Sequence, residues 1–332
     1  MKKVKVGVIG YGRLGAHHAM NVMRHTQAEL CAVADPMEQT LARAKSETGA
    51  KTYTDYRDIL ADPDIQAVVI ASPTKFHYDI LQDTIDANKS IFIEKPITYT
   101  VEEGEKIVEA VQKAGLYLQV GYMRRFDPGH VAAKKMIEAG EIGDPIYIQD
   151  CQRDPNGPPP GYVPESGGIY VDMGIHDLDC VRWLMGSEIT SIYSQGAVLK
   201  HKYLTELNDV DQATMALKFA SGALGNIEVS RNANDIYDTR TEIVGTKSSV
   251  FIGQSQHTPF VKVGKWGFQY DQANWCLGRF EKGYELEINA FIENVLHEKE
   301  SPVTAADGLV GLKLAKLATQ SYQEGAVVTI ES

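Results

Sequence analysis

The sequence is poor in cysteine, with four among 332 residues. Cys31, Cys151, Cys180 and Cys276 are scattered and form no CxxC pair. Disulfide frameworks and cysteine-based zinc sites both need matched or closely spaced cysteines, so neither is expected. Nor does any other metal-ligand spacing occur in the sequence. We therefore expect a protein of the reducing cytoplasm that holds no metal.

Long apolar runs and excess positive charge are also absent. No apolar stretch approaches the ~18–20 residues of a membrane span. The first apolar run, Val6–Ile9, is too short for the core of a signal peptide. With 33 basic against 44 acidic residues, the net charge is −11, which repels phosphate backbones and anionic lipids. Neither nucleic acid nor membrane is therefore an expected partner. A small uncharged substrate of a soluble protein fits better.

The length and the pattern of the first third predict a two-domain α/β protein. At ~100–200 residues per domain, 332 residues make two domains. Short apolar runs alternate with helical segments, which predicts right-handed βαβ units and a doubly wound parallel sheet. The expected strands are 3–9, 29–34, 67–70, 90–93 and 116–120, and the expected helices are 14–25, 42–47, 79–87 and 101–114.

The pattern changes after about residue 123, where we place the domain boundary, giving domains 1–123 and 124–332. The segments expected here are a helix at 131–138 and β-like stretches at 146–150, 189–198, 211–219, 223–230 and 241–252. Apolar residues alternate along Gln212–Phe219, which predicts an antiparallel sheet buried on one face. The tail is helical, with a capping box at Thr304–Asp307 before a last helix at about 305–322. Whether that helix packs back on the first domain stays open.

A glycine-rich turn predicts a dinucleotide site. Gly10-Tyr-Gly12-Arg13-Leu14-Gly15 follows a strand and opens a helix. The three glycines permit a tight turn, close approach to a pyrophosphate and close helix–strand packing. The loop and the N–H groups of the helix N-terminus then bind the phosphates. Asp35 ends the second strand, where a carboxylate accepts from the adenosine ribose and repels a 2′-phosphate. Because Pro36 and Met37 follow it instead of a basic residue, NAD is favoured over NADP.

Two further strand ends carry candidate residues, because ligands of parallel sheets lie beyond the carboxyl ends of the strands. Ser72, Pro73 and Thr74 follow one strand and either line the cofactor or form an ordinary proline turn. Glu94-Lys95-Pro96 follows the next. Lys95 is either a surface lysine or a positioned group that polarises a substrate oxygen. Glu94, Lys95 and His77 are also expected to contact the cofactor.

The combined motifs resemble the Gfo/Idh/MocA oxidoreductase family. The resemblance rests on the glycine loop, Asp35, Glu94-Lys95-Pro96 and the segment 167–179, and it covers essentially the whole chain. The segment 121–129 is similar to the inositol dehydrogenase branch. The family implies an N-terminal Rossmann domain and a C-terminal α+β domain with a large open, mostly antiparallel sheet. That sheet commonly mediates dimers or tetramers, so a homo-oligomer is expected.

The resemblance makes Asp172 and His176 the catalytic pair. On a helix they would lie one turn apart on one face. We expect His176 to act as general base, Asp172 to orient it and contact the substrate, and Lys95 to polarise the oxygen and relay the proton. From the residues alone, Asp172 as a helix N-cap and His176 as a core histidine remain alternatives.

Weaker candidates complete the expected substrate site. Arg124 and Arg125 follow the first domain, and Arg125 is expected at the substrate, with a structural ion pair as the alternative. Asp154 and Asn156 offer donors and acceptors suited to a polyol, and Tyr237 is a further candidate. The proline-rich loop 154–168 is either a lid or a subunit contact.

Several other polar residues are expected to be structural. His17 and His18 are adjacent near a helix start and are interpreted as capping or packing residues. The acidic pairs at 177/179 and 209/211 are interpreted as solvated or capping side chains instead of metal ligands.

These observations predict NAD-dependent oxidation of an inositol to an inosose by hydride transfer. Alternatives are a scyllo-inositol or aldose dehydrogenase, and, in a different class, a sensor that binds NAD without chemistry. Loss of Lys95 or His176 would mark the sensor, and both are present.

Overall fold

The computed structural model describes residues 3–234, 236–253, 261–265, 267–269, 271–273 and 275–330. The chain divides into two compact units, each described by itself. The first comprises Met1–Met123 and Tyr284–Leu312, and the second Arg124–Gly283 and Lys313–Ser332. Residues 284–312 thus return to the first unit late in the sequence. A single domain boundary at residue 123 does not include this return.

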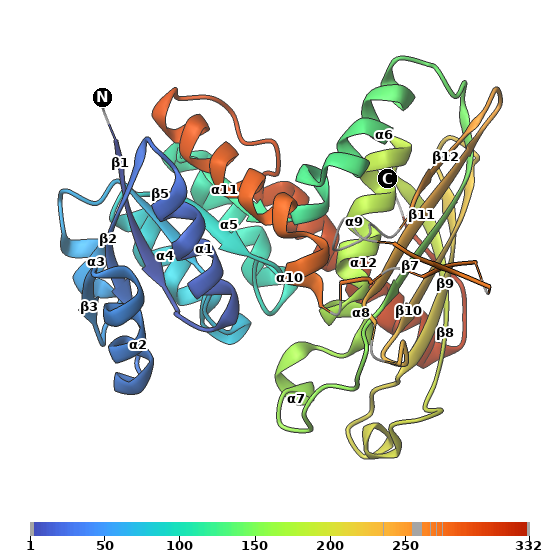
Figure 1. The fold of residues 1–332 in the computed structure, drawn as a ribbon, viewed down its shortest axis with the longest axis horizontal. Coiled ribbons are helices and arrows are strands. Elements are labelled where there is room, and N and C mark those ends of the chain that lie inside the picture. Colours follow the sequence, from blue (N-terminus) through green and yellow to red (C-terminus); the bar gives the residue numbers. More distant parts are fainter. Residues whose placement is uncertain are drawn as a thin grey trace. The chain divides into compact units, whose positions relative to one another are not determined.

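The first unit is built on a six-stranded sheet whose strand pairs are all parallel, as predicted. Its order is β3-β2-β1-β4-β5-β6, which is the doubly wound order of Rossmann domains (Figure 1). The strands are β1 (Val4–Ile9), β2 (Ala28–Ala34), β3 (Lys51–Tyr53), β4 (Ala67–Ile70), β5 (Ser90–Glu94) and β6 (Leu118–Gly121). The three-residue β3 has only exposed and half-buried positions, so its sequence carries no apolar run to reveal it.

Helices cover both faces of this sheet. They are α1 (Arg13–Arg24), α2 (Glu38–Thr48), α3 (Arg57–Ala61), α4 (His77–Asp86), α5 (Val101–Ala114) and α11 (Glu281–Leu296). Val6 and Val8 of β1 share one buried cluster with Phe291 of α11. Gly7, between them, faces Ile59 of α3 on the other side. Burial of the apolar face of α11 is the physical reason why residues 284–312 belong to this unit.

The second unit contains a seven-stranded sheet with the order β12-β11-β7-β10-β9-β8-β15. Only β7 and β10 pair in parallel, so the sheet is mostly antiparallel, as predicted. The strand expected at 241–252 is two strands joined by a turn, where Gly245 N–H donates to the Ser248 carbonyl. The strands are β7 (Pro145–Arg153), β8 (Ile189–Ala197), β9 (Gln212–Phe219), β10 (Leu224–Ser230), β11 (Asp238–Gly245), β12 (Ser249–Ile252) and β15 (Val328–Thr329), and β13 (Lys262–Gly264) pairs separately with β14 (Gly267–Gln269).

Helices lie along one side of the second sheet: α6 (Pro128–Glu138), α9 (Gly174–Met185) and the C-terminal part of α12 (Ala305–Glu324) (Figure 1). Residues on this face of the strands, such as Met215 and Ile227, are fully buried. On the other face Leu224 is 54% and Phe251 65% exposed. The predicted capping box of α12 is confirmed, because Thr304 and Asp307 exchange hydrogen bonds. Within the described ranges, no helix is long and apolar enough to cross a membrane.

Candidate functional site

The strand order of the first unit brings four predicted loops to one edge of its sheet. Asp35 follows β2, the glycine loop follows β1, Ser72–Thr74 follows β4 and Lys95 follows β5. These four strands are adjacent and parallel. Their carboxyl ends therefore share one edge, where ligands of such sheets bind.

The geometry of the glycine loop fits a bound diphosphate. Gly10 has φ +87°, and a Cβ there would lie 2.8 Å from Ala71 and Ser72 backbone atoms. A Cβ on Gly15 would lie 2.0 Å from the Gly10 carbonyl oxygen. A Cβ on Gly12 would meet no atom within 4 Å, so packing within the chain does not require this glycine, whereas close approach of a diphosphate does. No side chain caps α1 at Gly12, which leaves its first-turn N–H groups suited to an anion.

Asp35 lies beside this loop and is half-buried. One carboxylate oxygen accepts from the Tyr11 N–H at 2.9 Å, and the other accepts from the Met37 N–H at 3.0 Å. Arg43, which sequence reasoning missed, donates to the Tyr11 carbonyl and lies over the Tyr11 ring. Burial, and then the hydrogen bond to Glu47, raise the pKa of Tyr11 to about 12.

Replacing Asp35 with serine should relax the preference for NAD over NADP. The substitution removes the carboxylate that repels a 2′-phosphate, so the ratio of the two kcat/KM values should fall by about tenfold or more, which corresponds to ~1.4 kcal/mol. Steady-state kinetics with both cofactors measures the ratio. Asp58→Ser, an exposed position on α3, is the control. An unchanged ratio would place ribose recognition elsewhere.

The strand-end motifs are joined by a buried histidine. His77, 1% exposed, places one ring nitrogen 2.8 Å from the Pro96 carbonyl and the other 2.9 Å from the Ser72 carbonyl. Burial lowers the pKa of His77, and because a neutral ring has one N–H, it donates to only one of these two carbonyls at a time. The Ser72 hydroxyl is buried without a hydrogen-bond partner among the described residues, and Lys95 is half-buried. His77 therefore links the loops of Ser72 and Lys95.

Glu94, the residue before Lys95, belongs to a buried cluster with His18 and Glu287. His18 Nε2 lies 2.6 Å from Glu94 Oε1, which is a direct hydrogen bond. Packing was the correct interpretation of His18. Both carboxylate oxygens of Glu287, on α11, lack a hydrogen-bond partner within the described ranges. One ligand atom from each residue lies within 4.8 Å of the others. That spacing is one at which a metal ion could bind, and one ligand atom each of His18 and Glu94 is taken by the hydrogen bond between them.

The cluster predicts a pH-dependent stability. Burial, and then the Glu94 carboxylate, hold the pKa of Glu287 well above its usual range. The folded chain thus keeps a proton that the unfolded chain releases near pH 4.3. Stability should therefore fall as pH rises from about 4.3 towards the folded pKa. Glu287→Gln removes this loss, so the variant should gain in Tm over the wild type as pH rises.

Thermal unfolding between pH 4.5 and 8 measures this difference. A tenfold change in proton affinity corresponds to about 1.4 kcal/mol, and each kcal/mol shifts Tm by roughly 2–4 °C, so we expect a gap of several degrees at pH 8. Glu109→Gln, at an exposed position on α5, should follow the wild-type curve. Parallel curves for Glu287→Gln and wild type would contradict the assignment.

In the second unit, Asp172 and His176 do not share one continuous helix. Asp172 ends the short helix α8 (Ile169–Asp172), and His176 lies in the first turn of α9. Between them only Met173 is outside either helix, and its backbone stays in the right-handed helical region with φ −104° and ψ −56°. The two residues thus lie on successive short helices separated by one residue, and neither N-cap residue caps its helix through its own side chain. His176 is 8% exposed, and the Asp172 side chain is 17% exposed.

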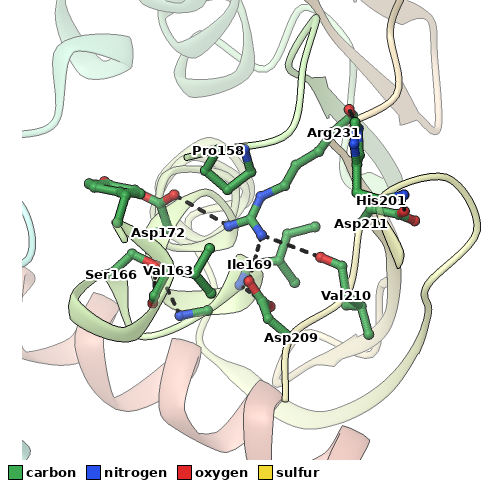
Figure 2. Close-up of polar contacts among 12 residues, drawn as sticks. Pro158, Val163, Ser166, Ile169, Asp172, His201, Asp209, Val210, Asp211 and Arg231 are labelled. Carbon is green, nitrogen blue, oxygen red and sulfur yellow. Dashed lines mark hydrogen bonds and ion pairs between the residues drawn. The ribbon is translucent and has the colours of Figure 1, made fainter. Parts of the chain in front are cut away.

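Tyr162 and Arg231 both contact the Asp172 carboxylate. The Tyr162 hydroxyl, from the short helix α7 (Val163–Ser166) at its N-cap, donates to Oδ1 at 2.9 Å. The Arg231 guanidinium approaches Oδ2 at 3.5 Å and also pairs with Asp209 at 2.5 Å (Figure 2). Sequence reasoning missed Arg231, which directly follows β10. Solvation was wrong for Asp209 and Asp211, which are buried, but the alternative of capping is confirmed for Asp209, which accepts from the Ile169 N–H at the start of α8.

A second buried charge network surrounds Arg124 and Arg125. Arg124 is 1% exposed and donates to Asp150 at 2.9 Å and to Asp177 at 2.8 Å. Arg125 binds Asp179 through two nitrogens. Solvation of the 177/179 pair is therefore also wrong, and the arginines form the ion pairs that the sequence left as an alternative. A substrate contact by Arg125 stays a prediction.

Family models match most of the chain. Residues 4–122 match the NAD-binding Rossmann fold of the Gfo/Idh/MocA oxidoreductases, and residues 134–330 match the C-terminal α/β domain of the same family. The chain belongs to the Gfo/Idh/MocA oxidoreductase family. Its first unit thus contains the family's NAD-binding domain, and the resemblance inferred from the motifs is confirmed.

Relatives within the Gfo/Idh/MocA family are similar along their whole length. The chain is 38% identical to scyllo-inositol 2-dehydrogenase (NAD(+)) of Bacillus subtilis, covering 99% of this chain and 97% of the relative. It is 35% identical to myo-inositol 2-dehydrogenase of Thermotoga maritima, covering 99% of each. The crystal structure of scyllo-inositol dehydrogenase from Lactobacillus casei with NAD(H) and scyllo-inositol superposes with a TM-score of 0.94 at 30% identity, covering 100% of each chain.

The remaining candidates of this family member lie in the second unit. Asp154 is half-buried, and its backbone N–H donates to the Ser230 carbonyl. Asn156 is exposed. Tyr237 is 2% exposed, and burial raises its pKa well above the usual range. Their contacts with a substrate stay predictions, as does the role of the loop 154–168.

Proposed function

We propose that this protein oxidises an inositol: inositol + NAD⁺ gives inosose + NADH + H⁺. The observation that carries the proposal is a Rossmann edge fitted for NAD in a chain that is similar from end to end to inositol 2-dehydrogenases. An uncharged polyol also suits a chain with a net charge of −11.

Three residues carry the proposed chemistry. His176 removes the proton from the reacting hydroxyl, and Asp172 orients the imidazole and binds a neighbouring hydroxyl. Lys95 donates to the substrate oxygen and stabilises the negative charge that develops there. Bound NAD⁺ supplies the hydride acceptor. The proposal requires Lys95 and His176 to act on the same hydroxyl.

The cofactor contacts are proposed at the edge of the first sheet. The glycine loop with Arg13 and Leu14 holds the diphosphate, and Asp35 binds the adenosine ribose. Ser72, Pro73, Thr74, His77, Glu94 and Lys95 contact the nicotinamide half. The orphan hydroxyl of Ser72 supports this placement.

A cofactor-reduction screen tests the function. Purified protein is incubated with NAD⁺ or NADP⁺ and with myo-inositol, scyllo-inositol, glucose or xylose, and absorbance at the NADH band is followed. We expect reduction of NAD⁺ with an inositol, and the relative kcat/KM values identify the isomer. Faster reduction of the cofactor with glucose or xylose than with either inositol would identify an aldose as the substrate instead. No reduction with any polyol would favour the sensor.

We also propose that the protein works in the cytoplasm as a homo-oligomer, a dimer or tetramer. The structure forms no disulfide among the described residues, which suits a reducing compartment. The exposed Leu224 and Phe251 on the open sheet face support self-association through that face. Light scattering of the eluting protein measures its mass, and a monomer would refute the oligomer.

A further inference from the structure

Arg231 is a buried arginine placed between two acidic residues. Its side chain is 1% exposed, although it directly follows β10 at the end of the strand. Nη1 pairs with Asp209 Oδ2 at 2.5 Å and lies 3.4 Å from the Val210 carbonyl. Nη2 reaches Asp172 Oδ2 at 3.5 Å. Figure 2 shows the guanidinium between the two carboxylates. One guanidinium group thus contacts both carboxylates, each through a different nitrogen.

The two carboxylates differ in what remains of their hydrogen-bonding capacity. Asp209 is 5% exposed in its side chain, and its other oxygen accepts from the Ile169 N–H at 2.9 Å. Asp172 is 17% exposed, and its second oxygen accepts from Tyr162, a residue that is itself 48% exposed. Of these two donors to Asp172, Arg231 is buried and Tyr162 faces solvent.

Asp209 extends this contact to the backbone that carries Asp172. Ile169 is the first residue of α8, and Gly167 and Gly168 before it have φ of +79° and +81°. The hydrogen bond from Ile169 to Asp209 fixes the helix directly after these two left-handed residues. Arg231 is thus tied to α8 at both ends, through Asp209 at its start and through Asp172 at its end.

We propose that Arg231 is a positioning residue of the dehydrogenase: it holds the Asp172 carboxylate in its working orientation and, through Asp209, holds the turn that presents it. This inference rests on the proposed function, because Asp172 is there the partner of His176. A guanidinium serves because it is a planar fork that donates in two directions, whereas an ammonium is a single point charge.

Substitution by lysine separates the two contacts. In Arg231→Lys the ammonium can keep the shorter ion pair with Asp209, but it lacks a second nitrogen for Asp172. We expect kcat to fall about 10- to 100-fold, with less than a threefold change in the NAD⁺ dissociation constant and little change in Tm. Arg182→Lys is the matched control, since Arg182 binds one carboxylate, Glu188, through two nitrogens. It should keep wild-type kcat.

A double-mutant cycle shows whether Arg231 acts through Asp172. In the Asp172→Asn background, Arg231→Lys should lower kcat by less than twofold further, because the contact it supports has already been altered. A merely structural arginine would give losses that multiply. Multiplying losses, or wild-type kcat in Arg231→Lys, would overturn the inference.

Hydrogen exchange gives a test that needs no turnover. Arg231→Met removes both contacts, and the Ile169 amide should then exchange at least about tenfold faster than in Arg182→Met. Unchanged exchange would overturn the inference even if no polyol is oxidised. Failure of the proposed function in the cofactor screen is therefore distinguishable from failure of this inference.

Discussion

Replacing His176 with alanine should lower kcat by about 100- to 10,000-fold, the usual contribution of a positioned general base. Without the imidazole, the hydroxyl proton has no positioned acceptor as hydride leaves. NAD⁺ affinity should stay within about threefold, because the proposed diphosphate and ribose contacts belong to the glycine loop and Asp35. Lys95→Ala should give a loss of similar size, because the developing oxyanion then lacks its cation.

Turnover is followed by NADH absorbance, and NAD⁺ binding by calorimetry on the same preparations. His297→Ala is the control for the imidazole, since the His297 side chain is 50% exposed. Lys113→Ala, at an exposed position on α5, is the control for the ammonium. Activity that survives in His176→Ala or Lys95→Ala would remove the role assigned to that residue. If His176→Ala also lost NAD⁺ binding, the fall in kcat would reflect a disrupted cofactor site and not the loss of a general base.

Replacing Arg124 with alanine should destabilise the second unit by about 3–5 kcal/mol, the usual result of removing one partner from a buried ion pair. Asp150 and Asp177 are fully buried around it, and Arg124 pairs with Asp150 at 2.9 Å, so a buried carboxylate would lose its counter-ion. Burial holds the pKa of Asp177 well above its usual range, which favours its protonated form.

Urea denaturation with the two variants Arg124→Ala and Arg124→Met/Asp150→Asn tests this assignment. The double variant removes both charges together and should recover much of the lost stability, since neutral replacement of a buried pair is often tolerated. Arg57→Ala is the control, because the Arg57 side chain is 62% exposed and surface pairs contribute ~1 kcal/mol or less. If the double variant is less stable than Arg124→Ala, the charge argument is wrong.

The features that could be predicted from sequence are those encoded by residues close together in the chain. The glycine loop, Asp35 and the strand–helix alternation need only short spacings and periodicities, so the doubly wound sheet was predictable. The segment at Asp172 and His176, which we propose carries the chemistry, was singled out through its family resemblance. Its division into two short helices at Met173 was missed, because spacing alone does not show where a helix is interrupted.

The missed residues depend on partners distant in sequence. Arg231 lies 22 residues from Asp209 and 59 from Asp172, and only the pairing of β10 with its neighbours brings them together. Glu287 precedes the apolar positions of α11 and looks like a solvated residue by periodicity. It is buried because that helix packs inside the first unit. Solvation of the acidic pairs at 177/179 and 209/211 was wrong for the same reason, whereas capping was right for Asp209.

The late return of residues 284–312 to the first unit has a consequence for synthesis on the ribosome. The strands of this unit emerge first, but the helix that covers Val6 and Val8 follows only after residues 124–283 have been translated. At ~5–20 residues per second this interval lasts roughly 8–30 s. During that time an apolar face of the nascent sheet is uncovered and available to chaperones. The first unit thus completes its core only after most of the second has been made.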